Sequence, residues 1–259
     1  MKTYKIITRD REKSEEVKQE LDLKLKLIKE DINPDYVFAI GGDGTIISAI
    51  HRYPNAIIFG IHTGHLGFFA NYSPNEIDEI VNEVNTNTFK VEELDLLSVN
   101  VVLDDDTTIN DFAVNEATLV SPLRTLIVDV SIDNEYLEKF RGTGLCISTP
   151  YGSTAYNKSL HGSVVDTTIK TIQLTEIAGI NSNAYRTLSS PLILNDKRVI
   201  TLTGDNYTDL FLTVDHLSYN VSNMKSMVIK YAGKSAKIAY NSHVSFLSRL
   251  NRTFLISKD

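Results

Sequence analysis

The residues that most clearly suggest a binding or catalytic role come directly after an unbroken apolar run, Tyr36–Ile40. They form the segment Gly41–Thr45, which reads Gly-Gly-Asp-Gly-Thr. Glycines at such a junction let main-chain N–H groups and a helix N-terminus approach phosphate oxygens closely. The segment lacks the Gly-Lys-Ser/Thr ending of a P-loop and the glycine spacing of the dinucleotide fingerprint. We therefore predict a phosphate-binding loop of a different kind, made of Gly41, Gly42, Gly44 and Thr45.

Asp43 is the unusual member of this loop, because a carboxylate repels the phosphates that the glycines would attract. Two roles explain a carboxylate among phosphates: it bridges to a metal ion, or it faces an attacking hydroxyl group. The competing interpretation is structural, since Asp-Gly pairs are common in tight turns and Asp is a common helix cap. We therefore predict a functional role for Asp43, with both of these roles still open.

A second glycine-rich corner, His62–Phe69, follows the next apolar run and should open at the same rim of the sheet. Its two histidines, His62 and His65, have no Cys or carboxylate beside them at metal-ligand spacing. We therefore expect either a polar contact with a ligand, for which His65 is the candidate, or plain loop structure. Phe68 either stacks on a base or packs beneath the loop.

Two later segments also suit nucleotide recognition. Asn115 offers the paired donor and acceptor that match an adenine edge, and Glu116 suits ribose hydroxyls, although an exposed pair at a strand end would look the same. In Arg141–Tyr156 a buried strand leads into a glycine- and hydroxyl-rich loop that offers many neutral donors. The alternative there is a hairpin loop of small residues. Ser153 lacks the nucleophile-elbow pattern of a serine hydrolase.

These motifs must be positioned by elements of two kinds. Before about residue 90, predicted strands at 4–8, 36–40 and 56–61 alternate with predicted helices at 13–29, 45–53 and from Ser73-Pro74 onward. This alternation predicts a Rossmann-like parallel α/β domain. Later, strands dominate, at 97–103, 118–120, 126–132, 199–203, 210–214 and 226–231, with one helix expected at 168–180. That pattern predicts an antiparallel β-sandwich.

Composition supports an ordinary globular protein with two domains. The 259 residues are 42% hydrophobic and 23% charged, which excludes disordered and collagen-like classes. We place an α/β nucleotide-binding domain at 1–93 and a β-sandwich substrate-binding domain at 94–245, with a tail at 246–259 packing back on the first. The net charge of −7 and the lack of a basic tract argue against a nucleic-acid partner.

The compartment follows from what the chain lacks. Its single cysteine, Cys146, cannot form an internal disulfide and lies in an apolar run. No segment approaches the ~20 apolar residues of a membrane span, and the N-terminus has no signal-peptide stretch. We expect a cytoplasmic protein with no membrane partner.

In combination, the motifs resemble those of the bacterial NAD kinases. The likeness rests on Gly41–Gly44, Asn115-Glu116 and Ser148–Tyr156 in this order, and it extends to Gly60–Phe68 and Thr187–Leu192. Gly-Gly-Asp-Gly alone also occurs in phosphofructokinases and in diacylglycerol or sphingosine kinases. The Thr-Pro-x-Gly-Ser-Thr-Ala-Tyr loop is far more specific, and the match spans nearly the whole chain.

The resemblance implies the reaction and the partners. It implies an α/β domain followed by a β-sandwich, with the active site between them. It also implies transfer of the ATP γ-phosphate to the 2′-hydroxyl of the adenosine ribose of NAD, giving NADP, with a divalent metal cation such as Mg²⁺. Members are generally homo-oligomers, so a homotetramer or homodimer is expected.

The resemblance also implies residue roles. Asp43 would accept the proton of the 2′-hydroxyl, Asn115 would contact adenine and Glu116 the ribose. The remaining predicted substrate-binding positions are Gly44, His65, Phe68, Arg141, Thr143, Tyr151, Thr154, Ala155, Tyr156, Ser159, Ala178, Tyr185 and His216, some of them reaching a neighbouring subunit's site.

The chain departs from the family pattern at Thr143, where the family usually has an Asp that is thought to bind the nicotinamide carboxamide. A threonine hydroxyl is shorter and uncharged, which changes the nicotinamide side of the site. Two other functions therefore stay open on the sequence: a lipid or sugar kinase sharing the glycine loop, and a catalytically weak regulator that binds NAD.

Overall fold

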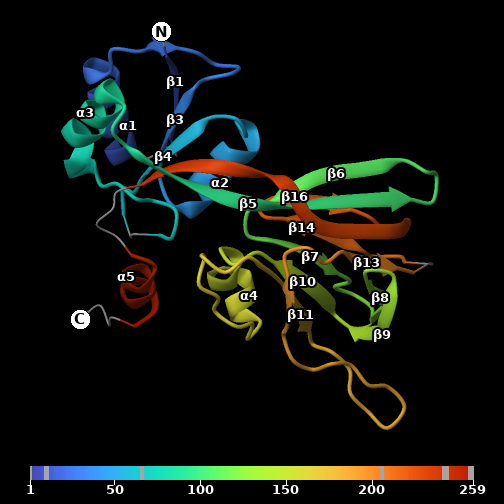
Figure 1. Cartoon of the computed structure of the whole chain (residues 1–259). Helices are drawn as coiled ribbons and strands as arrows, with labels where there is room; N and C mark the ends of the chain where they lie inside the picture. The colour runs from blue at the N-terminus through green and yellow to red at the C-terminus, as the bar shows by residue number, and fades with distance from the viewer. Residues whose placement is uncertain (1, 9–11, 65–66, 205–206, 241–244, 256–259) are drawn as a thin grey trace. The chain divides into compact units, whose positions relative to one another are not determined.

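The chain forms two compact units, 1–94 with 235–259, and 95–234 (Figure 1). This computed structural model describes residues 2–8, 12–64, 67–204, 207–240 and 245–255. The strands β5 (Lys90–Leu103) and β16 (Met224–Tyr240) contribute residues to both units.

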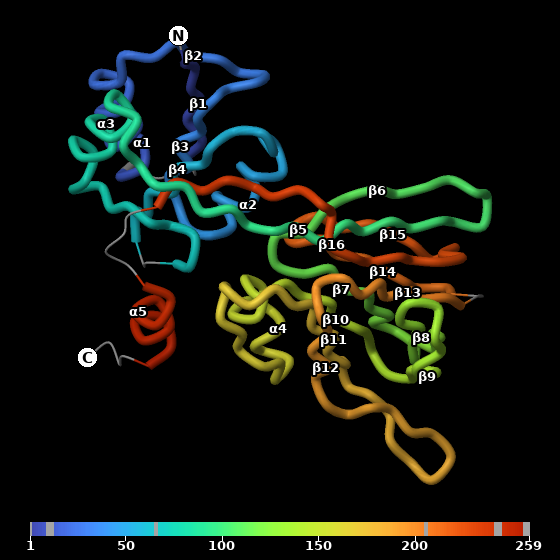
Figure 2. The backbone as a smooth tube through the Cα atoms, viewed as in Figure 1, coloured from blue at the N-terminus to red at the C-terminus, as the bar shows by residue number. Residues whose placement is uncertain are grey.

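The first unit is a parallel sheet with helices, as the alternation of strand and helix patterns predicts. Its strands have the order β2-β1-β3-β4, and residues 237–239 of β16 add parallel to β4. The strands are β1 (Thr3–Thr8), β2 (Ile28–Lys29), β3 (Tyr36–Ile40) and β4 (Ile57–Ile61), and the helices are α1 (Glu12–Lys24), α2 (Asp43–Arg52) and α3 (Ile77–Thr86) (Figure 2).

Aromatic packing forms much of this unit's core. The rings of Phe38 on β3 and Phe59 on β4 stack with centroids 5.0 Å apart, and Tyr36 meets Phe59 edge to face. All three are buried. Since β3 is buried along its full length, with α2 beginning directly after it, the glycine segment is fixed at the carboxyl end of a rigid strand.

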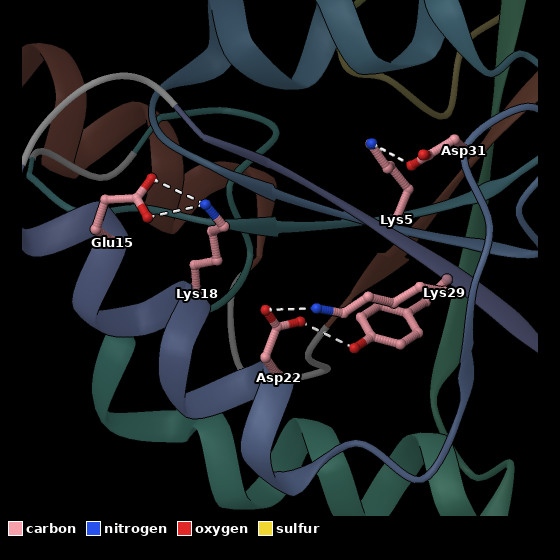
Figure 3. Close-up of polar contacts among 7 residues, drawn as sticks. Lys5, Glu15, Lys18, Asp22, Lys29 and Asp31 are labelled. Atoms are coloured by element: carbon pink, nitrogen blue, oxygen red, sulfur yellow. Dashed lines mark hydrogen bonds and ion pairs between the residues drawn. The ribbon is translucent and has the colours of Figure 1, made fainter.

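Ion pairs orient α1 on the sheet (Figure 3). Asp22 of α1 pairs with Lys29 of β2 at 2.8 Å and accepts a hydrogen bond from the Tyr4 hydroxyl at 2.9 Å. Lys5 of β1 pairs with Asp31 after β2. Partly exposed pairs contribute up to ~1 kcal/mol each, so their main effect is to fix how α1 and the sheet edge meet.

Two helix boundaries differ from the sequence predictions. The first helix ends at Lys24 rather than at residue 29, because Ile28 and Lys29 pair with β1 as an edge strand. The second helix begins at Asp43 rather than at residue 45, so the Asp-Gly pair lies inside the first helical turn. At Ser73 the predicted start is confirmed by a capping box with Glu76, in the short 3₁₀ turn η1 (Pro74–Glu76) before α3.

The second unit is antiparallel and contains two sheets, which confirms the predicted β-sandwich class. One sheet has the order β12-β11-β10-β7-β14-β15, and in the other β8 pairs with β9 and β13, β13 with β16, and β5 with β6. The strands not yet given are β6 (Thr108–Ala113), β7 (Glu116–Val120), β8 (Leu126–Ile132), β9 (Glu135–Gly142), β10 (Gly144–Ser148), β11 (Thr171–Ile177), β12 (Leu192–Asn195), β13 (Ile200–Thr203), β14 (Phe211–Val214) and β15 (Leu217–Asn220).

The predicted helix at 168–180 is wrong, because residues Thr171–Ile177 form strand β11. This strand lies between β10 and β12, and four successive residues, 172–175, are buried. Burial on both faces hides the alternation that marks a half-exposed strand. The β-branched residues Thr171, Ile172, Thr175 and Ile177 were the signal for a strand.

Short helical segments complete the chain. They are η2 (Gly152–Thr154), α4 (Tyr156–Ser159), α5 (Phe246–Leu250) and η3 (Asn251–Leu255). None of the helices within the described residues is long and apolar enough to cross a membrane.

Candidate functional site

The first glycine corner is built by close backbone approach at the end of β3. Gly41 donates its N–H to Ile61 O at 2.9 Å, and a Cβ on Gly41 would lie 2.4 Å from Thr45 Oγ1. Gly42 is extended and serves as the N-cap of α2. The helix N-terminus carries partial positive charge, so it favours phosphate groups and also the Asp43 carboxylate in its first turn.

Asp43 connects this corner to the second one. Its Oδ2 accepts the Phe68 N–H at 2.9 Å, and its Oδ1 accepts the Phe69 N–H at 3.0 Å. A Cβ on Gly67 would lie 2.1 Å from Asp43 Oδ1, so only glycine leaves room for the carboxylate there. The two corners therefore meet, as their places after neighbouring parallel strands predict, and the carboxylate is held in a fixed orientation.

The C-terminal segment holds the second corner from its other side. Arg249 on α5 donates to Phe68 O at 2.9 Å and to Asn71 Oδ1 at 2.5 Å. The Phe68 ring lies 5.7 Å from that of Phe254. Of the two roles expected for Phe68, this contact supports packing. Arg249 was missed by sequence reasoning, because nothing local marks an arginine 181 positions from its partner. His65 lies outside the described residues.

In the second unit Asn115 and Glu116 are buried, each only 8% exposed, rather than an exposed pair at a strand end. Within the described part of the chain, Asn115 Oδ1 and Glu116 Oε2 have no hydrogen-bond partner. Burial, and then the charge of Asp215, raise the pKa of Glu116 to about 8, against a smaller opposing effect of the Tyr156 N–H. Buried, unused oxygens are costly unless a ligand satisfies them.

The hydroxyl-rich loop is folded around Asn115. Thr149 donates its N–H to Asn115 O at 2.8 Å and its hydroxyl to Val114 O at 2.7 Å. A Cβ on Gly152 would lie 2.1 Å from Asn115 O. The Ser153 hydroxyl is buried and bonded to Pro150 O at 2.6 Å, a structural role that agrees with the absence of a nucleophile elbow.

The rest of this loop exposes part of its surface beside Glu116. Tyr156 is 46% exposed while its N–H bonds to Glu116. Thr154 donates its hydroxyl to Tyr151 O at 3.0 Å, Ala155 closes the η2 turn through Gly152 O, and Ser159 ends α4 in an exposed position. Of the predicted adenosine-lining residues, Tyr156 thus contacts the Asn-Glu pair directly, through its N–H.

A separate group gathers Arg141, Ala178 and Tyr185. The Arg141 guanidinium lies over the Tyr185 ring, 4.3 Å from its centroid, and Ile180 N donates to Arg141 O at 2.7 Å. Ala178 has a positive φ of 48° and is exposed.

Thr143 and His216 are both exposed. The Thr143 backbone joins Ser121 and Ile177, which leaves its side chain outward. His216 directly follows Asp215 in the β14–β15 turn.

Among the residues that the structure describes, no group of three or more His, Cys, Asp or Glu side chains is arranged to hold a metal ion. A preformed all-protein cage is therefore not part of the described chain. Mg²⁺ needs none, since it is usually bound by one or two carboxylates together with substrate phosphates and water. Asp43, at the phosphate-binding helix terminus, fits that requirement as a single carboxylate.

Comparison with known proteins gives the family. The chain matches the ATP-NAD kinase N-terminal domain over residues 2–89 and the ATP-NAD kinase C-terminal domain over residues 114–239. It is 36% identical over 265 aligned positions to an NAD kinase of Staphylococcus epidermidis, covering 99% of this chain and 98% of that protein.

Two solved structures share the fold. Yeast NADH kinase, complexed with NADH, superposes with a TM-score of 0.87 at 20% identity, over 99% of this chain and 89% of that chain. An NAD kinase from Archaeoglobus fulgidus, in complex with ATP, gives 0.75 at 21% identity, over 93% and 94%. With both domain families matched in order and a relative aligned along almost its full length, this chain belongs to the NAD kinase family.

Proposed function

We propose that this protein is an NAD kinase that transfers the γ-phosphate of ATP to the 2′-hydroxyl of the adenosine ribose of NAD and so makes NADP. The observation that carries the proposal is the match to an NAD kinase at 36% identity across 99% of the chain. The fixed carboxylate at the glycine-rich corners and the two unused oxygens of the Asn-Glu pair agree with it.

Asp43 orients the attacking hydroxyl in this mechanism. An ordinary Asp has a pKa of about 3.9, far below that of a sugar hydroxyl, so it is a poor base for the free alcohol. Phosphoryl transfer passes through a loose transition state in which alignment matters more than early proton removal. A carboxylate fixed by two backbone N–H groups suits that task, because it can accept the hydroxyl proton without losing its position.

The phosphates of the donor are assigned to the first glycine corner, with Gly41, Gly42, Gly44 and Thr45. The N-terminus of α2 supplies the partial positive charge. Thr45 is 4% exposed, so it would contact the phosphates through its main chain. The absence of a Cβ on Gly41 leaves room for the Thr45 side chain. Mg²⁺, held by the phosphates with Asp43, would neutralise charge on the transferred group.

The nucleoside is assigned to the second unit. Asn115 Oδ1 would accept from the adenine amino group, and Glu116 would bond the ribose hydroxyls, so both buried oxygens gain partners. The adenosine pocket would be lined by Thr154, Ala155, Tyr156 and Ser159, and Tyr151 would be a further substrate-binding residue. The parts of the substrate beyond the adenosine would be contacted by Arg141, Thr143, Ala178, Tyr185 and His216. The protein would be a homotetramer or homodimer.

The test is a coupled assay with purified protein, ATP, Mg²⁺ and NAD, in which an NADP-specific dehydrogenase detects the product. We expect NADP to form and EDTA to abolish its formation. Diacylglycerol, sphingosine and fructose 6-phosphate serve as competing acceptors. Turnover of one of these without NADP would assign a lipid or sugar kinase, and NAD binding without turnover would assign a regulator.

A further inference from the structure

One carboxylate, that of Asp215, holds the chain just before the β7 strand. Its Oδ2 accepts the Val114 N–H at 2.8 Å, and its Oδ1 accepts the N–H groups of Asn115 and Glu116 at 2.8 and 3.2 Å. Asp215 also donates its own N–H to Glu116 O at 3.0 Å. Its φ of 51° turns the chain so that side chain and backbone can both reach the same segment.

Three successive N–H groups that converge on one anion form a backbone nest, a feature that usually receives a ligand's phosphate or carboxylate. Here the protein fills the nest with its own side chain. Bonds from N–H groups to an ionised carboxylate are about twice as strong as neutral ones. The segment is therefore fixed before any ligand arrives.

The opposite side of the same segment is fixed too. Thr149 uses the carbonyls of Val114 and Asn115, and Asp215 N uses that of Glu116. Every main-chain donor and acceptor from Val114 to Glu116 thus has a partner, while Asn115 Oδ1 and Glu116 Oε2 have none among the described residues. The main-chain groups of this segment are thus all hydrogen-bonded within the protein, and the two side-chain oxygens are available to bond a ligand.

We propose that Asp215 is a positioning residue for nucleotide binding: it holds Val114–Glu116 so that Asn115 and Glu116 meet the nucleoside as a pre-oriented pair. This inference rests on the proposed function of the site. Pre-orientation lowers the entropic cost of fixing both side chains when a ligand binds. In this role Asp215 acts through the backbone of Val114–Glu116 rather than on the phosphates or the reacting atoms, so its removal should weaken NAD binding more than it slows the chemical step.

The charge of Asp215 gives the proposal a second readout. Glu116 lies near the Asp215 carboxylate of the β14–β15 turn, the Cys146 thiol of β10 and the Tyr156 N–H of α4. The Asp215 charge adds to burial in raising the pKa of Glu116. Neutralising Asp215 makes ionised Glu116 less costly, so the pKa of Glu116 falls. The limb of the kcat/KM profile that reports this group should therefore move to lower pH.

The experiment compares Asp215→Asn with a matched control, Asp133→Asn. Asp133 also lies in a hairpin turn at positive φ, 52°, and also accepts a distant N–H, that of Val199 at 2.9 Å. In Asp215→Asn an amide NH₂ faces a backbone donor that it cannot bond. We expect the KM for NAD to rise about tenfold, kcat to stay within about twofold, and the pH limb to move down. Asp133→Asn should leave all three unchanged.

Calorimetric titration of NAD into the same proteins, without ATP, separates this inference from the proposed function. Absence of NADP formation by the wild type would overturn the proposed function, and the ratio of NAD dissociation constants would still decide the role of Asp215. A wild-type KM and dissociation constant in Asp215→Asn, or a loss confined to kcat, would overturn the inference. If Asp215→Asn does not fold, Asp215→Glu decides: it keeps the charge and displaces the carboxylate, so KM should rise while the pH limb stays.

Discussion

At the scale of single residues, Asp43 combines two demands in one carboxylate. In the proposed mechanism it points at a hydroxyl group, and it stays in place beside phosphates that repel it. The two N–H groups of Phe68 and Phe69 meet the second demand. The competing interpretation of Asp43 as a helix cap in a tight turn is wrong, because Gly42 is the N-cap of α2, no side chain caps the helix, and Asp43 lies in its first turn.

Asp43→Asn tests the role in chemistry. The amide keeps the shape of the side chain but loses the charge, and its NH₂ cannot accept a backbone N–H. We expect kcat to fall about a hundredfold or more, with the dissociation constant for NAD within a few-fold of wild type. Steady-state kinetics and NAD titration measure the two quantities. Retained turnover would show that another group orients the hydroxyl.

Gly67→Ala tests the position of the same carboxylate without altering it. The new Cβ would lie 2.1 Å from Asp43 Oδ1, so the carboxylate must move. Gly64→Ala is the matched control in the same corner, because among the described residues no atom beyond its chain neighbours lies within 4 Å of its Cβ. We expect kcat to fall ~10- to 100-fold in Gly67→Ala and to stay near wild type in Gly64→Ala. Equal kcat values in the two variants would contradict the importance of this contact.

At the scale of elements, α5 supports the second glycine corner through Arg249. Arg249 donates a hydrogen bond to the carbonyl of Phe68, and the Phe68 N–H donates to Asp43. The guanidinium and the carboxylate therefore hold the backbone of the same residue. Asn71, the second partner of Arg249, donates in turn to Ala239 O at 3.3 Å. The second glycine corner is thereby tied to both α5 and β16.

Arg249→Ala should loosen that corner. We expect the free energy of unfolding to fall by about 2 kcal/mol and kcat to fall about tenfold, as the orientation of Asp43 becomes less defined. Arg252→Ala, at an exposed position in the next turn, is the control and should change neither value. Urea denaturation and steady-state kinetics give the two readouts. A loss of stability with unchanged kcat would limit α5 to a structural role.

At the scale of the whole molecule, the net charge of −7 raises the question of how an acidic protein attracts two polyanionic nucleotides. The proposed answer is local. Main-chain N–H groups and a helix N-terminus provide positive potential at the first glycine corner, and Mg²⁺ adds formal charge. Long-range attraction of nucleotides should be weak, and binding should depend on the metal.

The expected homodimer or homotetramer would also be a property of the whole molecule. Large apolar side chains are exposed on β8, β9 and the segment 180–188, where Ile127, Tyr136, Leu137, Tyr185 and Leu188 are each at least 38% exposed. The Leu188 N–H bonds to Glu138 of β9 at 3.1 Å, which fixes the segment on that strand. We predict that these side chains form an interface between copies of the chain, because exposed apolar surface often marks an interaction site.

Leu188→Glu tests whether this surface joins copies of the chain. We expect the wild type to run as a dimer or tetramer and the variant as a smaller species in size-exclusion chromatography with light scattering. Leu23→Glu on α1, at an 86% exposed position in the other unit, is the control and should keep the wild-type mass. A monomeric wild type, or an unchanged mass in Leu188→Glu, would exclude this interface.

The sequence by itself determined the features that depend on local pattern. Buried strands β3 and β4, the glycine corners that follow them, the capped start before α3 and the strand-rich second half were all predicted from apolar runs and turn residues. These features depend on neighbours within a few positions, and the resemblance to NAD kinases added the identity of the site.

Only the tertiary structure decided which residues share a site and in what state. It placed the N–H groups of 68 and 69 on Asp43, Arg249 on Phe68 and Asp215 on the Asn-Glu pair, across separations of 25 to 181 positions. It also made β11 a strand and buried Glu116, which raises the pKa of that carboxyl. All of these have the same physical reason. Burial and long-range hydrogen bonds depend on which distant segments the fold brings together, and the local sequence pattern does not encode this.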